Sequence, residues 1–100
     1  MKEQEMLYLE VGIAMTDAVK SQLFRKPCFK INGKAFVCFF QDEMVFKLTG
    51  DDHANALSSV GSQLFDPSGK KRPMKEWVQV PFDYKEKWTD FTHAAYKYAG

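Results

Sequence analysis

The dipeptide Asn32-Gly33 constrains this chain more than any other feature, because it lies between two β-prone runs within residues 28–40. Asparagine and glycine accept the positive φ angles that both central residues of a type I′ hairpin turn require. A second turn, around residues 41–43, leads into another β-prone run, and a segment of alternating polarity precedes the hairpin. Residues 18–48 are therefore predicted to form an antiparallel meander.

Helical periodicity is found on both sides of this meander. Residues 3–16 place apolar side chains on one stripe, and a shorter helix is predicted to begin near Asp51 and to end near Gly61. The last helix is predicted to begin at Asp83, with Glu86 completing a capping box three residues later. Its apolar stripe consists of Tyr84, Trp88, Phe91, Ala95 and Tyr98.

Two short extended segments, residues 63–65 and 77–80, are predicted between the second and the last helix. The predicted order is thus α-β-β-β-α-β-β-α, which is typical of a two-layer α+β sandwich with an antiparallel sheet. The 100 residues contain no repeat and no linker, and their number matches the commonest size of a domain. We therefore predict a single domain over residues 1–100.

A two-residue hairpin loop also sets a register, in which Cys28 lies opposite Val37. Neighbouring residues of a strand point to opposite faces of the sheet. Cys28 and Cys38 are therefore predicted to lie on opposite faces, where no disulfide can join them. The same register places Phe29, Ile31, Phe36, Cys38 and Phe40 on one face.

The second face of this hairpin carries Ala35, Val37 and Phe39. A two-layer fold usually exposes polar side chains there, so an apolar second face indicates an additional cover. These three residues are the candidate interface for a homodimer or a protein partner. The alternative is that the sheet curls and both faces are covered within the chain.

Charge and composition bear on partners and location. A net charge of +1, from 14 basic and 13 acidic side chains, provides no overall attraction to nucleic acid or to an anionic membrane. Two cysteines fit free thiols better than a disulfide framework. The N-terminal residues are too polar for a signal peptide, and no apolar run reaches the ~20 residues of a membrane span. We predict a cytoplasmic protein without membrane contact.

The residues of a standard active site are not found in the sequence. His53 follows two aspartates, but acidic residues are favoured in a first helical turn by the helix dipole alone. His93 falls off the apolar stripe, and neither histidine has the spacing of a zinc or calcium ligand. Without a Cys-x-x-Cys pair, both cysteines are interpreted as small buried hydrophobes. We predict that the protein is not an enzyme and takes no cofactor or metal.

The most distinctive charged segment is the glycine-hinged basic loop at residues 69–75. Such a loop is typical either of a solvated surface or of a site for an anion or a nucleic-acid backbone. The cations before the hairpin extend the patch if the fold brings the two segments together. The candidate patch consists of Arg25, Lys26, Lys70, Lys71, Arg72 and Lys75.

Two motifs carry a resemblance to a known family: Asn-Gly-Lys-Ala at 32–35 and Arg-Pro-Met-Lys-Glu-Trp at 72–77. With Phe-Asp-Pro at 65–67, Pro81 and the final helix, residues 18–99 resemble a stand-alone N-terminal domain of the TfoX family. The resemblance implies a fold similar to type III secretion chaperones, with action through partners. Full-length members resemble regulators of natural competence.

These observations lead to two functional hypotheses. The first is a non-enzymatic protein-interaction or regulatory module that uses the apolar second face of the hairpin. The second is a nucleic-acid or anion-binding accessory protein, linked to transcription or competence regulation, that uses the basic patch.

Overall fold

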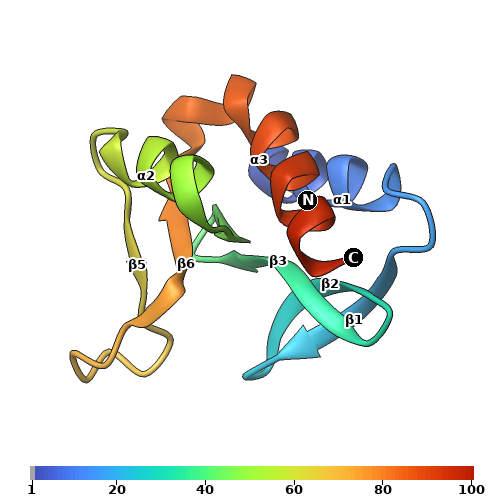
Figure 1. Ribbon diagram of the computed structural model, residues 1–100, viewed down its shortest axis with the longest axis horizontal. Coiled ribbons are helices and arrows are strands. Elements are labelled where there is room, and N and C mark those ends of the chain that lie inside the picture. The colour runs from blue at the N-terminus through green and yellow to red at the C-terminus, as the bar shows by residue number, and fades with distance from the viewer. Residues whose placement is uncertain (1) are drawn as a thin grey trace.

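The structure, a computed structural model, describes residues 2–100 as one antiparallel sheet with three α-helices (Figure 1). The elements are α1 (Glu3–Ile13), β1 (Val19–Leu23), β2 (Lys26–Ile31), β3 (Lys34–Phe40), β4 (Glu43–Lys47), α2 (Gly50–Ser58), β5 (Gln63–Phe65), β6 (Met74–Val80) and α3 (Lys85–Ala99). The α+β class is as predicted. The predicted order was one strand short, because four strands rather than three precede α2.

The missing strand boundary lies at Phe24-Arg25, which turns β1 into β2 without a glycine. Both residues have positive φ, at 51° and 65°, as a tight hairpin turn requires. Non-glycine residues rarely adopt this region, and a bulky phenylalanine there is an outlier. The Asn32-Gly33 turn has the predicted positive φ at both positions, 52° and 79°.

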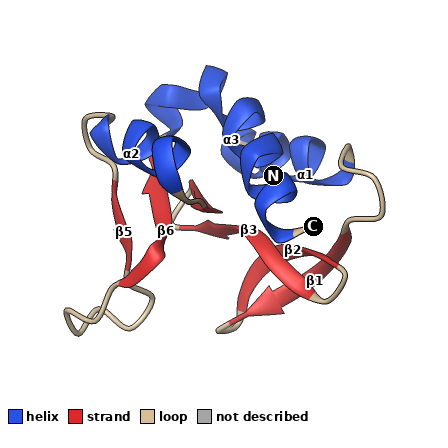
Figure 2. Cartoon of the chain, viewed as in Figure 1, coloured by secondary structure: helices blue, strands red, loops and turns tan. Residues whose placement is uncertain are grey.

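The sheet has the strand order β1-β2-β3-β4-β6-β5, so β1 and β5 form its edges. All three helices lie on one side of it, with α3 over β3 and β4 and α2 beside β6 (Figure 2). The main core between these layers includes Tyr8 of α1, Trp88 of α3 and the fully buried Phe46 of β4. One sheet face is therefore covered by helices.

A β-bulge corrects the predicted register of the central hairpin. Cys28 lies opposite Cys38, and Phe29 lies opposite Val37, because Phe36 is an extra residue in β3 where the register shifts. Beyond the bulge, side chains exchange faces relative to a regular hairpin. The prediction that the two cysteines occupy opposite faces was wrong.

The last helix begins two residues later than predicted and without the capping box. A 3-10 turn at Phe82–Tyr84 precedes it, in which the Tyr84 amide donates to the Pro81 carbonyl at 3.0 Å. Tyr84 is then the N-cap, and no side chain caps the helix. Asp83, which was expected to cap the helix, therefore lies inside the 3-10 turn.

Candidate ligand-binding surface

The sheet face away from the helices carries a second buried cluster, here called the outer cluster. It consists of Cys28, Cys38, Val45, Phe65 and Trp77. None of the five is more than 6% exposed, and none comes from a helix. Leu23, Ala35, Phe40 and Met74 pack against it. The sheet face away from the helices is therefore apolar at its centre, and the five side chains of this cluster are buried by other residues of the same chain.

Two segments from opposite ends of the sheet meet on this surface. The β2–β3 pair contains a β-bulge, which increases the local twist, and the register of the β5–β6 pair also shifts. The β1–β2 turn and the loop between β5 and β6 border one hollow of about 360 Å³, here called the tip hollow. It is lined by Phe24, Lys26, Pro67, Ser68, Arg72 and Met74.

The lining combines apolar side chains with two cations from opposite ends of the sheet. Phe24 is 57% exposed at the turn, although a phenylalanine has no polar group to favour water. The ammonium of Lys26 lies 5.1 Å from the centre of the Phe40 ring, which holds this cation over the outer face. Arg72 lies on the facing loop.

Asp66 orders the β5–β6 loop. Its Oδ1 accepts hydrogen bonds from the Ser68 hydroxyl at 2.7 Å and from the amides of Ser68 and Gly69 at 3.2 and 3.1 Å. Its Oδ2 accepts from the Arg72 amide at 3.2 Å. These bonds, first that of the Ser68 hydroxyl, lower the pKa of the carboxyl below its ordinary value. One carboxylate thus holds the loop that carries Arg72 against the hollow.

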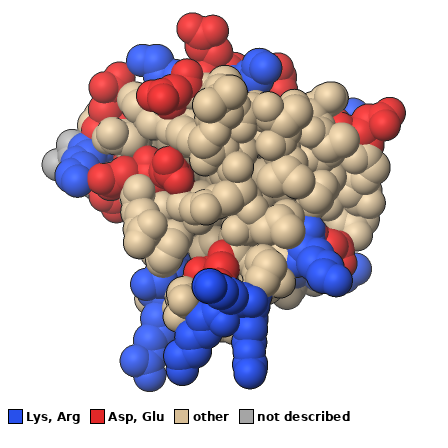
Figure 3. All heavy atoms as spheres, turned by 90° about the vertical axis from the view of Figure 1, so that its left-hand side faces the viewer, with Lys and Arg blue, Asp and Glu red and all other residues tan. Residues whose placement is uncertain are grey.

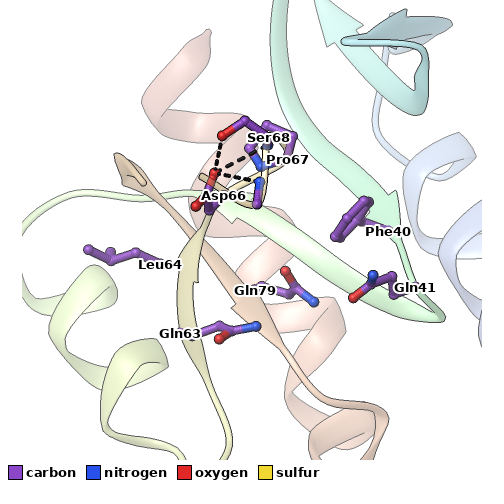
Figure 4. Close-up of a pocket in the computed structure, with 9 residues that line it drawn as sticks. Phe40, Gln41, Gln63, Leu64, Asp66, Pro67, Ser68 and Gln79 are labelled. Atoms are coloured by element: carbon purple, nitrogen blue, oxygen red, sulfur yellow. Dashed lines mark hydrogen bonds between the residues drawn. The ribbon is translucent and has the colours of Figure 1, made fainter. Parts of the chain in front are cut away.

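A second hollow, of about 370 Å³, lies on the other side of the same loop and is here called the amide hollow (Figure 4). The side chains of Gln41, Gln63 and Gln79 lie toward one another within it. Gln79 is only 2% exposed, and its amide donates to Glu43 at 2.7 Å. Both hollows are bordered by Pro67 and Ser68, so they adjoin on one surface.

The basic residues gather at the end of the molecule that carries the two loops, the lower end in Figure 3. Of the predicted patch, the fold brings Lys26 and Arg72 to the tip hollow, with Arg25 in the adjoining turn. Lys70 and Lys71 are exposed on the loop. Lys75 follows in β6, where its carbonyl is 2.7 Å from the Nε2 of His53. The local cation density exceeds what the net charge of +1 suggests.

The three residues of the predicted apolar interface do not share a surface. Val37 is fully buried beneath the helices, and Phe39 packs on the same side, stacked at 5.2 Å on Tyr8. Ala35 packs against the outer cluster on the opposite face. The bulge at Phe36 separates them.

Phe24 was not predicted as a site residue, because the segment before the hairpin shows only an alternation of polar and apolar residues. The only local signal is the charged pair Arg25-Lys26 directly after it, ahead of Pro27. The amide hollow gave no sequence signal at all, since its glutamines come from three separate segments.

Further observations concern metals, membranes and relatives. Within residues 2–100, no group of three His, Cys, Asp or Glu side chains is arranged to hold a metal ion. Among the helices of this part of the chain, none has the length and apolar character to cross a membrane. Comparisons with protein-family models, with curated proteins and with solved structures found no match.

Proposed function

We propose that this protein is a non-catalytic protein-interaction or regulatory module that takes an acidic segment of its partner into the tip hollow. The observation that carries this proposal is the meeting of two loops from opposite ends of the sheet around one hollow, with a cation on each side. The remaining patch cations extend the positive surface beyond the hollow.

The chemistry of the lining favours a ligand with an anionic and an apolar part. Lys26 and Arg72 offer charge-assisted hydrogen bonds to carboxylates, and Arg does so with two parallel donors. Phe24 and Met74 offer apolar contact, and removing Phe24 from water would add hydrophobic stabilisation on binding. An acidic peptide with an apolar side chain satisfies both.

Two features prepare the hollow before the ligand arrives. Phe24 lies in a tight hairpin turn with positive φ at both central residues, so the backbone that carries its ring has a defined conformation. The loop that carries Arg72 is held by four hydrogen bonds to Asp66. Because these segments are already ordered in the free protein, binding does not have to pay the entropy cost of ordering them.

The lining of the tip hollow supports binding rather than catalysis. Its six side chains supply one hydroxyl, that of Ser68, and include no imidazole, thiol or carboxylate. The hydroxyl hydrogen-bonds Asp66, but Asp66 is committed to three backbone amides as well. A nucleophile with a free base beside it is therefore not assembled there.

Single-stranded nucleic acid is the second candidate ligand. An exposed aromatic ring beside cations is the arrangement on which unpaired bases stack while the backbone follows the positive charge. Phe24 with Arg25 and Lys26 provides such a group. The resemblance to the TfoX N-terminal domain supports a regulatory role, in transcription or competence, for either ligand.

Fluorescence anisotropy tests the proposal with three labelled probes: a glutamate-rich peptide that contains one leucine, a single-stranded oligonucleotide and a duplex. We expect salt-sensitive binding of the peptide, weakened roughly tenfold in the Lys26→Ala/Arg72→Ala double variant. The matched control is Lys87→Ala/Lys97→Ala, which removes two lysines from α3 and should bind as the wild type does.

Each outcome has a defined meaning. Tighter binding of the single strand than of the peptide, with a log–log salt slope of about 0.7 for each phosphate contacted, would favour the second candidate. No binding of any probe at low salt would refute both candidates. Equal behaviour of the two double variants would show that the tip hollow is not the site.

A further inference from the structure

The two cysteines form a directly opposed pair at the centre of the outer face. Cys28 of β2 lies opposite Cys38 of β3, and the two are 1% and 0% exposed. A single row of paired residues continues across all six strands. In strand order it runs Ser21, Cys28, Cys38, Val45, Gln79 and Gln63.

This pairing meets the geometric requirements of a disulfide. Directly opposed residues of an antiparallel pair have Cα atoms about 4.5–5.5 Å apart. Disulfides are found at Cα separations of about 4.4–6.8 Å, with both Cβ atoms on the same side. The side chains of Cys28 and Cys38 belong to the same buried cluster, so both lie on the outer face of the sheet. The backbone pairing and the shared face therefore both allow a disulfide between Cys28 and Cys38.

The surroundings shift the pKa values of the two thiols in opposite directions. The neighbouring Cys38 thiol lowers the pKa of Cys28 and burial opposes this shift, while the charge of Lys30 and the Ser21 hydroxyl act in the same direction as Cys38. The neighbouring Cys28 thiol, together with burial, raises the pKa of Cys38. Cys28 is therefore the stronger nucleophile of the pair, because the thiolate is the reactive form.

We propose that Cys28 and Cys38 are a reversible dithiol–disulfide pair that hydrogen peroxide or a related small peroxide oxidises within one chain. In the first step the Cys28 thiolate attacks one peroxide oxygen, the O–O bond breaks, and a sulfenic acid and hydroxide form. In the second step the Cys38 sulfur attacks the Cys28 sulfur. The S–O bond breaks, the hydroxyl leaves as water with the Cys38 proton, and the S–S bond forms.

An external dithiol reverses the change. Its thiolate attacks the disulfide to give a mixed disulfide, and its second thiol then releases the protein dithiol while the reagent itself is oxidised. The protein sulfurs gain two electrons and two protons in all. No atom of the fold other than the two sulfurs changes its bonding.

The peroxide reaches the buried pair by local opening of the sheet edge. β1 is the edge strand next to Cys28, five residues long, and in the sheet it is bonded only to β2. Its first residue, Val19, is 63% exposed, so little apolar burial holds that end. Short edge elements of this kind open far more often than the whole domain unfolds.

Thiol counting on the full chain tests the proposal. The reduced protein is treated with hydrogen peroxide, then alkylated with N-ethylmaleimide in denaturant and weighed by mass spectrometry. We expect two alkylated thiols before oxidation, none after it, and two again after dithiothreitol, with the protein monomeric on a non-reducing gel. Two thiols that persist through oxidation would overturn the proposal, as would a disulfide between chains or a loss that dithiothreitol does not reverse.

Two kinds of variant separate this chemistry from general oxidation. In the Cys38→Ser variant, Cys28 should accumulate a sulfenic acid that dimedone labels, and Cys28→Ser should be labelled several-fold less at Cys38. The control Val37→Cys/Cys38→Val keeps two cysteines but moves one beneath the helices, and both of its thiols should stay free. Disulfide formation in this control would refute the assigned register. Circular dichroism confirms folding of each variant, and Cys→Ala replacements serve where a Cys→Ser variant does not fold.

Discussion

Replacing Gly12 with alanine should destabilise this protein, although the same change in an ordinary helix is stabilising. Gly12 lies within α1 and is buried. A Cβ atom built at this position would overlap three ring atoms of Phe29 on the sheet below. Phe29 is itself fully buried and lies 5.2 Å from the ring of Tyr8, so it has no space to move into.

The magnitude follows from two opposing terms. Alanine in a helix interior is favoured over glycine by about 1 kcal/mol. Overpacking of a filled core costs about 1–3 kcal/mol, and overlap with an immobile ring belongs at the upper end. Gly12→Ala should therefore lower the free energy of unfolding by about 2 kcal/mol, which is a shift of the urea midpoint by roughly 1 M.

Urea unfolding followed by tryptophan fluorescence measures this change. The control is the double variant Gly12→Ala/Phe29→Leu compared with Phe29→Leu alone, in which the smaller side chain leaves room for the new methyl group. In that background the alanine should be neutral or stabilising. A midpoint for Gly12→Ala at or above that of the wild type would refute the packing of α1 on Phe29.

Three further predictions concern the outer face and its loop. Asp66→Ala should weaken binding at the tip hollow although it makes the surface more positive, because the loop that carries Arg72 loses its order. Anisotropy with the glutamate-rich peptide measures this affinity, and tighter binding would mean that charge alone decides it. Because the pKa of Asp66 is lowered in the folded state, its contribution to loop order is present above the ordinary carboxyl pKa and is lost as pH falls through the folded value. Amide exchange at Gly69, compared by NMR with an amide in β3, should show this acid loosening, and an unchanged ratio would contradict it. Phe65→Ala should lower the free energy of unfolding by about 3–5 kcal/mol, whereas the exposed Phe24→Ala should change it by less than about 0.5 kcal/mol; similar urea midpoints for the two would show that the outer cluster is not a core.

The dithiol and the proposed ligand site share one part of the sheet. Cys28 belongs to β2, the strand that continues the turn bearing Phe24 and Lys26. Met74 lines the tip hollow and also packs against the outer cluster that contains both sulfurs. A disulfide would tie β3 to β2, the strand that contributes Lys26 to the hollow, so the binding experiments should also be made with the oxidised protein.

Local signals were enough for most elements of the fold. The Asn32-Gly33 turn, the helical stripe around Trp88 and the strand before Pro81 lie where the sequence predicts them. Each depends on neighbouring residues, whose conformational preferences act without the rest of the chain. The Phe24-Arg25 turn was missed because positive φ at a phenylalanine has no local cause, and only the surrounding sheet can impose it.

The candidate site could be predicted only in part. The sequence identified the cations of both segments but could not predict that Lys26 and Arg72 border one hollow. Along the chain, 45 residues lie between them, and these include the three strands β3, β4 and β5. Phe24 and the glutamines of the amide hollow had no local pattern to mark them. Their meeting depends on the tertiary fold.

By itself, the sequence determined the α+β class, the central hairpin and the helices, because turn chemistry and apolar periodicity are properties of short segments. The tertiary structure alone decided which face each side chain occupies. One extra residue at Phe36 moved Val37 under the helices and brought Cys38 opposite Cys28, because a shift of one position reverses every side chain beyond it. The tertiary structure alone also brought the β1–β2 turn and the β5–β6 loop to one hollow, because these segments lie far apart in the sequence.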